Sequence, residues 1–173
     1  AKWHCISVQL SVTTLDATLA RAMEPRASSP LRRLDAIEAL AAAGIPVGVL
    51  TAPVIPGLND HEMPAILAEA KRRGALHASY TILRLPYAVK DLFVNWLGEV
   101  VPDRKEKVLG RIREIRDGKL NETGFGQRHK GSGIFAEQIR SLFDVSCRKA
   151  GLNRTWPPLT TEHFRRPEPP RAQ

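Results

Sequence analysis

The run from Ile45 to Ala52 is apolar at almost every position and has the length of one β-strand. Strands without polar alternation are typical of parallel sheets, because helices cover both faces of such sheets. Gly44 stops the preceding pattern, and Pro53 and Pro56 are expected to end the strand. This run therefore favours a fold in which parallel strands are joined by helices.

Strand and helix patterns alternate around this run. Residues 5–14 alternate between apolar and polar side chains, which is the period of a strand, and another strand is predicted over residues 78–85. Helical spacing of apolar residues predicts helices over residues 30–43, 61–73 and 89–100. Short connections between alternating strands and helices are the signature of βαβ units. We therefore predict an α/β fold in which residues 1–102 hold three parallel strands and their helices.

The rest of the chain has a different character. Residues 103–154 are predicted to be a helical extension of the same domain, with a charged helix from Asp103 to Asp117 and a last helix over residues 134–150. A loop rich in glycine and basic residues, 124–133, separates them and is either a phosphate cradle or a solvated loop. Residues 155–173 form a Pro/Arg-rich tail that is expected to be partly disordered.

Charge and cysteine content limit the classes of partner and site. The net charge of +8 favours anionic partners such as nucleic acid. The chain holds no run of about 18 apolar residues that could span a membrane, and no signal peptide is visible, so we expect a cytoplasmic protein without a membrane partner. Cys5 and Cys147 cannot form a metal site alone, and both are expected to be buried free thiols.

Candidate functional residues are expected where the parallel strands end, because ligands bind at that edge in both common architectures of this class. Ser11 and Thr13 make the first strand polar on one face. Their hydroxyl groups need partners, which are either a ligand or neighbouring protein groups. The turn of residues 56–60 offers backbone N–H groups at the start of a helix. We assign no catalytic residue and no metal ligand.

Three stretches of sequence are more specific than these patterns. They are Met23-Glu24-Pro25-Arg26-Ala27-Ser28-Ser29-Pro30-Leu31-Arg32-Arg33-Leu34, Ala43-Gly44-Ile45-Pro46-Val47-Gly48-Val49 and Ala52-Pro53-Val54-Ile55-Pro56-Gly57-Leu58-Asn59-Asp60. They closely resemble the radical-SAM proteins related to spore photoproduct lyase, the DNA repair photolyase-like group. Shorter stretches that end at Leu85-Pro86, Gln127-Arg128 and Asn153-Arg154 extend the resemblance from about residue 6 to residue 154.

The resemblance implies a partial (β/α)6 TIM-like barrel that binds S-adenosylmethionine and a [4Fe-4S] cluster. Such an enzyme cleaves S-adenosylmethionine reductively to a 5′-deoxyadenosyl radical. The family holds its cluster with a Cys-x3-Cys-x2-Cys motif, which this sequence lacks. We therefore expect the chain to be the C-terminal half of such a barrel, with residues 5–14 as the fourth strand. Alone it is expected to bind neither group and to be catalytically silent.

The same resemblance implies roles for five residues in binding the cofactor. Ser11 matches the fourth-strand hydroxyl that contacts S-adenosylmethionine in several radical-SAM enzymes, and Thr13 faces the same way. Arg26 resembles the basic residue that some members place near the carboxylate of the cofactor. Gly57 and Asn59 match the turn after the fifth strand, which approaches the adenosine.

The sequence leaves open two other interpretations of the chain and more than one partner. The chain could instead be part of an unrelated parallel α/β barrel enzyme, or a non-catalytic module that binds nucleic acid. Its expected partner is the missing N-terminal half of the barrel. Without that half, an exposed first strand is expected to pair with a second copy into a homodimer, unless the tail after Asn153 or the residues before Cys5 cover it.

Overall fold

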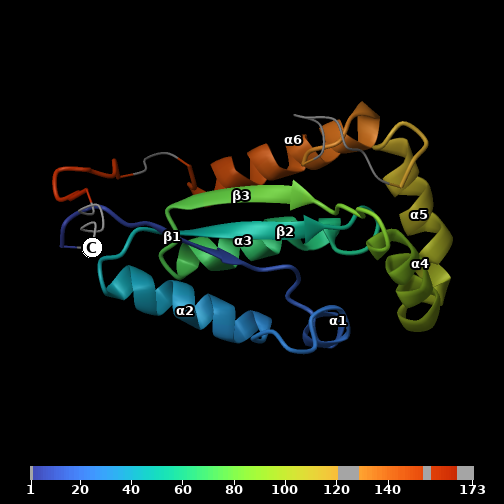
Figure 1. The fold of residues 1–173 in the computed structure, drawn as a ribbon, viewed down its shortest axis with the longest axis horizontal. Helices are drawn as coiled ribbons and strands as arrows, with labels where there is room; N and C mark the ends of the chain where they lie inside the picture. Colours follow the sequence, from blue (N-terminus) through green and yellow to red (C-terminus); the bar gives the residue numbers. More distant parts are fainter. Residues whose placement is uncertain (1, 121–128, 154–156, 167–173) are drawn as a thin grey trace, which may run out of the picture.

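The fold is built around three parallel strands, β1 (Val8–Ser11), β2 (Val47–Val54) and β3 (His77–Ile82). This computed structural model describes residues 2–120, 129–153 and 157–166. The strands are hydrogen-bonded in the order β1-β2-β3, and both pairs are parallel (Figure 1). The α/β class and the parallel order of the strands are therefore as predicted.

The strand limits differ from the predicted ones. β1 is four residues long and β3 ends at Ile82, so both are shorter than the strands predicted over residues 5–14 and 78–85. β2 instead runs through Pro53 to Val54, although the prolines were expected to end it. The register shifts between Thr51 and Val54, and the Leu83 N–H donates to the Val54 carbonyl at 2.9 Å. Pro53 therefore lies at an irregularity, where proline is tolerated within a strand.

Helices follow each strand, as the helical spacing predicts. They are α2 (Pro30–Ala42), α3 (Met63–Arg72) and α4 (Val89–Val100), and a short 3-10 helix, η1 (Asp60–Glu62), leads into α3. One further helix, α1 (Ala17–Met23), was not predicted. Asp16 caps α1 by accepting hydrogen bonds from the N–H groups of Thr18 and Leu19.

The C-terminal elements occupy two places. A 3-10 helix, η2 (Pro102–Arg104), and α5 (Lys105–Glu114) lie with α4 beyond the arrowheads of the strands (Figure 1). The long helix α6 (Gly133–Ala150) lies along the sheet beside α3. The first half of the glycine-rich basic loop predicted over residues 124–133, residues 124–128, lies outside the described residues.

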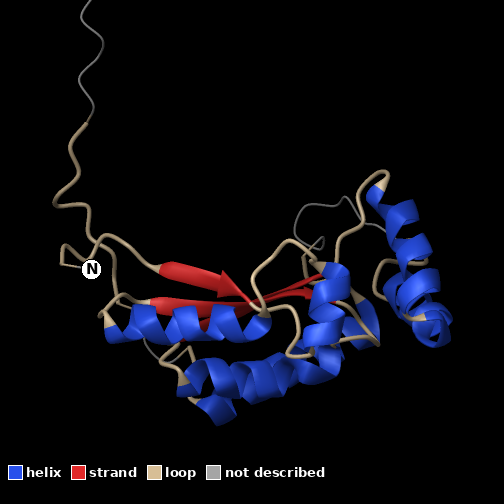
Figure 2. Cartoon of the chain, turned by 90° about the horizontal axis from the view of Figure 1, so that it is seen from below, coloured by secondary structure: helices blue, strands red, loops and turns tan. Residues whose placement is uncertain are grey.

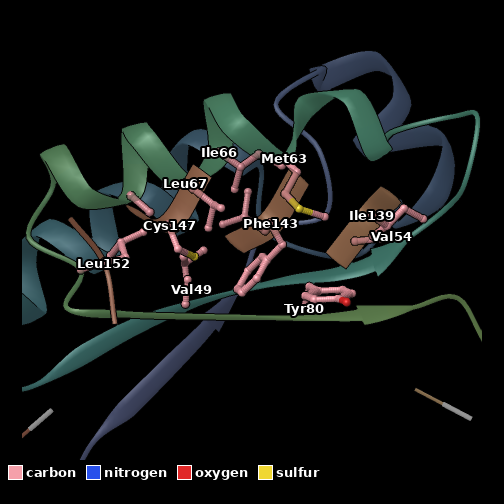
Figure 3. Packing of buried hydrophobic residues seen from close by; sticks show 14 of the residues in the cluster. Val49, Val54, Met63, Ile66, Leu67, Tyr80, Ile139, Phe143, Cys147 and Leu152 are labelled. Carbon is pink, nitrogen blue, oxygen red and sulfur yellow. The ribbon is translucent and has the colours of Figure 1, made fainter. Parts of the chain in front are cut away.

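The main core lies between the sheet and the three helices α2, α3 and α6, which share one face of it. Val49 and Tyr80 point from the strands into this layer, where Leu67 and Phe143 cover them (Figure 3). The view from below shows the strands along one side of the molecule with α2 beneath them (Figure 2). Because side chains alternate along a strand, the residues between these core positions belong to the opposite face.

A second core closes the ends of β2 and β3 against α4 and α5. Its buried members are Ile55, Leu58, Leu85, Leu97, Val108, Leu109 and Ile112. The apolar stripe of α4 is only partly used, since Leu97 is fully buried while Leu92 is 68% exposed. In the described part of the chain, no helix is long and apolar enough to cross a membrane.

Two described segments, one before β1 and one within the C-terminal tail, are in contact. The Thr160 N–H donates to the His4 carbonyl at 2.9 Å, and the rings of Trp3 and His163 lie 5.2 Å apart. These contacts involve residues that precede β1. The tail therefore contacts the segment leading into β1.

Candidate functional site

The polar face of β1 is placed opposite the helix layer. Val12 is fully buried in the main core, so its neighbours Ser11 and Thr13 belong to the other face. The Ser11 hydroxyl donates to the Ala52 carbonyl at 2.8 Å, and the Thr13 hydroxyl lies 3.0 Å from the same carbonyl. The Ala52 carbonyl is thus the acceptor for Ser11 and one of two acceptors for the Thr13 hydroxyl, the other being Glu24 Oε2 at 3.0 Å. Both hydroxyl oxygens keep their capacity to accept hydrogen bonds.

A cavity of about 240 Å³ opens at the C-terminal end of β1, between α1 and the start of α2. Thr13 and Thr14 form part of its lining and are 5% and 0% exposed. The other lining residues are Ala17, Ala20, Arg21, Glu24, Pro25, Ala27, Ser28, Ser29, Pro30 and Arg33. The cavity therefore has both a polar and an apolar lining, and it lies at the end of the strands where ligands bind in this fold class.

One ion pair forms a wall of this cavity. Arg33 lies 3.2 Å from Glu24, and the guanidinium also donates to the carbonyls of Ser11 and Ser28, both at 3.0 Å. Glu24 Oε2 is in addition 3.0 Å from the Thr13 hydroxyl. The Arg33 side chain is 15% exposed, so these contacts hold it in place. The ion pair therefore links α2, the loop after α1 and β1.

Two basic residues, Arg21 and Arg33, line this cavity. Arg26 is exposed and is not part of the lining, whereas Arg21 and Arg33 are. Sequence reasoning missed Arg33 although it stands in one of the quoted stretches. Its position in the predicted helix over residues 30–43 gave no signal that its guanidinium reaches β1, 22 residues earlier.

Asn59 is buried and joins the ends of two strands. It is 3% exposed, and its amide nitrogen donates to the carbonyls of Thr13 at 2.8 Å and Pro53 at 3.0 Å. Its amide oxygen accepts from the Ile55 N–H at 2.6 Å. Both amide hydrogens are therefore used within the protein, and Asn59 is not part of the cavity lining.

Glu62 makes a second connection between the same two loops. One carboxylate oxygen accepts from the Thr14 hydroxyl at 2.6 Å, and the other accepts from the Leu15 N–H at 2.7 Å. Sequence reasoning did not single out Glu62, because its partners lie 48 and 47 residues earlier in the chain. The loop after β2 thus holds the loop after β1.

Gly57 faces α5. Its φ of +83° is a conformation that favours glycine, and a Cβ there would lie 3.2 Å from the Arg111 Cδ. The Gly57 N–H donates to Asp60 at 3.0 Å, and Asp60 also pairs with Arg111 at 3.4 Å. The structure therefore brings Ser11 and Thr13 together at the Ala52 carbonyl, but of the five predicted residues only Thr13 lines the cavity. The other four lie outside the lining: Ser11, Arg26, Gly57 and Asn59.

Comparison with known protein families bears on the first part of the chain. Residues 1–70 match the family model of the Radical SAM superfamily. Every residue that lines the cavity lies within this matched segment. A radical SAM protein in general uses S-adenosylmethionine and a [4Fe-4S] cluster.

Similar curated proteins are known from mycobacteria. The uncharacterized protein Rv2578c of Mycobacterium tuberculosis and the uncharacterized protein Mb2609c of Mycobacterium bovis are each 30% identical to this chain over 158 residues. The similarity covers 90% of this chain and 43% of each relative, so the chain spans less than half of their length. No solved structure matches the chain.

The cysteines of this chain do not fit an iron–sulfur cluster. Cys5 is exposed, contrary to the prediction, because it precedes β1 instead of lying in it. Cys147 is buried in the main core, where burial and then Asp144 raise the pKa of its thiol to about 11. Within residues 2–120, 129–153 and 157–166, no group of His, Cys, Asp and Glu could hold a metal ion. Two thiols cannot supply the three that the cluster motif provides.

Proposed function

We propose that this chain forms part of the S-adenosylmethionine-binding wall of a radical SAM enzyme, and that residues outside these 173 hold the cluster. The observation that supports this most is the position of the cavity. It lies at the C-terminal end of β1, within the segment that matches the Radical SAM superfamily. Ligands bind at this end of the strands in parallel α/β folds.

The polar residues of the cavity suit a ligand that carries both signs of charge. S-adenosylmethionine has a carboxylate, an ammonium and a sulfonium group, and when bound it supplies the 5′-deoxyadenosyl group used in radical chemistry. Arg21 and Arg33 offer positive charge to a carboxylate, and Glu24 offers negative charge to a cation. Glu24 uses Oε2 for both Thr13 and Arg33, which leaves Oε1 as an acceptor.

Within the superfamily, we propose the branch related to spore photoproduct lyase, with damaged DNA as the substrate class. The support is the close resemblance of the three quoted stretches and the net charge of +8, which favours a polyanionic substrate.

The coding sequence that contains this chain gives the first test. An upstream Cys-x3-Cys-x2-Cys motif would support the proposed radical SAM chemistry, on which the choice of branch depends, and its absence would contradict both.

Ligand binding gives the second test, with Thr13→Val as the decisive variant. Valine keeps the shape of threonine but removes the hydroxyl, so S-adenosylmethionine affinity should fall about fivefold or more. Thr51→Val is the matched control, because Thr51 is 2% exposed, bonds the Ser79 carbonyl and does not line the cavity. NMR titration measures both affinities. Unlike the expectation from the sequence, the proposal requires that the chain alone binds S-adenosylmethionine weakly. Equal affinities in the two variants, or no binding by the unmodified chain at millimolar ligand, would therefore contradict it.

A further inference from the structure

The floor of the cavity is held from behind by residues that do not line it. Thr13 and Thr14 lie in the loop after β1, and their fixed partners come from the loop after β2. Asn59 and Glu62 supply these contacts across 46 to 48 residues of sequence. The shape of the cavity therefore depends on a long-range contact between two loops.

Asn59 fixes the backbone of Thr13. Its amide nitrogen bonds the Thr13 carbonyl on one side and the Pro53 carbonyl on the other, so one side chain sets the spacing between the ends of β1 and β2. At 3% exposure, water cannot readily replace these bonds. Loss of the amide would leave buried carbonyl groups without donors.

Glu62 fixes the next two residues. Its carboxylate accepts from the Thr14 hydroxyl and from the Leu15 N–H, so both oxygens act on the same loop. The Thr14 hydroxyl in turn accepts from the Asp16 N–H at 3.0 Å, and Asp16 caps α1. A chain of hydrogen bonds thus runs from η1 through Thr14 to the first turn of α1.

We infer that Asn59 and Glu62 are positioning residues, which set ligand affinity by holding Thr13 and Thr14 at the floor of the cavity. Neither residue lines the cavity, so each acts through the loop after β1. This role differs from the one that the resemblance implies, in which the turn that holds Asn59 approaches the adenosine. The inference rests on the proposed function only for the identity of the ligand, S-adenosylmethionine.

The test compares Glu62→Ala with Glu62→Gln. Alanine removes both acceptors. Glutamine keeps an oxygen for the Leu15 N–H and presents an NH2 group to the Thr14 oxygen, so it restores the contact without the charge. We expect S-adenosylmethionine affinity to fall about fivefold in Glu62→Ala and to recover to within about twofold in Glu62→Gln.

Glu69→Ala is the control for a purely structural loss. Glu69 bonds Arg72 and Arg73, and among the described residues no hydrogen bond or ion pair joins it to the loop after β1. This variant should lose stability but keep its affinity, with all measurements made well below the unfolding temperature. Unchanged affinity in Glu62→Ala, or an equal loss in Glu69→Ala, would overturn the inference.

A second readout does not depend on the ligand. The methyl NMR signals of Thr13 and Thr14 should shift in Glu62→Ala and stay in place in Glu69→Ala. Of these two glutamates, Glu62 is the one that bonds their loop. If the unmodified chain binds no S-adenosylmethionine while these shifts appear, the proposed function fails and the positioning role stands. Absent shifts would refute the positioning role whatever the ligand.

Asn59→Asp gives an independent check, since it places carboxylate oxygen against two carbonyls and should shift the Thr13 signal.

Discussion

The two outer edges of the sheet end in different ways. Along β3, the side-chain amide of Asn153 accepts from the Ala78 N–H at 2.7 Å and donates to the Ala78 carbonyl at 3.1 Å, as a neighbouring strand would. The Ile82 N–H donates to the His129 carbonyl at 2.9 Å, and the Asn153 N–H donates to the Leu76 carbonyl at 3.1 Å. The chain's own C-terminal residues therefore pair with this edge.

The outer edge of β1 is treated differently. The N–H groups of Val8 and Val12 donate to β2, so the backbone of Gln9 and Ser11 faces outward. The Ser11 carbonyl accepts from Arg33, but the Gln9 N–H and carbonyl have no partner in the part of the chain that the structure describes. Sheets with one paired and one unpaired edge can extend at one side only. β1 is thus the strand at which a further part of a barrel, or a second copy, would pair.

The largest effect is expected from removing the strand-like contact of Asn153. Asn153→Asp keeps the acceptor for the Ala78 N–H but sets a carboxylate oxygen against the Ala78 carbonyl. Stability should fall by about 2–3 kcal/mol in urea unfolding. Asn95→Asp is the control, because Asn95 is exposed on α4, and it should change stability by less than about 0.5 kcal/mol. Equal losses in both variants would show that the β3 edge does not need this contact.

Proline substitutions separate the two sides of β1. Val8→Pro removes an N–H that bonds the Pro46 carbonyl at 2.9 Å, so it should cost about 1–2 kcal/mol of stability. Gln9→Pro removes only the outward N–H and should cost less. We predict a homodimer paired through this edge, so light scattering at micromolar concentration should show a dimer that Gln9→Pro disrupts. A monomer before substitution, or a dimer that survives it, would argue against pairing at β1.

Local patterns in the sequence were enough to predict the three strands of the sheet and most of the helices. The apolar run of β2 and the spacing in α2 and α4 each depend on a few neighbouring residues. α1 was missed because it has seven residues, although Asp16 was available as a capping signal. The limits of all three strands also differ from the predicted ones. The strand pattern continues past the last paired residue of β1 and β3, and β2 continues past Pro53.

The site was harder to predict because its contacts are long-range. Ser11 and Thr13 could be found from alternation along one strand. Asn59 was noticed for its place in a turn, but its partner Thr13 is 46 residues away and only the folded chain shows that its amide is already used. Glu62 and Arg33 look like ordinary charged residues on helix surfaces, and nothing local distinguishes them from their neighbours. The contacts of such residues depend on which loops the fold brings together.

The smallest expected effect is the pH dependence of stability that comes from an ion-pair network between α2 and α3. This network is a reference for the effects expected at the two edges of the sheet. Hydrogen bonds from Arg72 and then Arg73 lower the pKa of Glu69 from 4.5 to about 2. Arg73 also pairs with Asp35 and Glu38 on α2, so this network joins α2 to α3 away from the contacts at the β1 and β3 edges.

Because the pKa of Glu69 is lower in the folded state, its contribution to stability is complete above pH 4.5 and is lost as the pH falls toward 2. The Glu69 side chain is 29% exposed, and solvent screening limits the loss to about 1 kcal/mol or less. Urea unfolding between pH 6 and pH 2.5 measures it, with Glu69→Gln as the control that lacks the titrating group. The stability of Glu69→Gln should depend less on pH over this range.

The loss of stability caused by Asn153→Asp, measured above pH 6, should be the same in the chain with Glu69 and in the chain with Gln at that position. An equal pH dependence with and without Glu69 would assign the acid sensitivity to other carboxylates, and a changed Asn153→Asp cost would mean that the helix layer and the β3 edge are not independent.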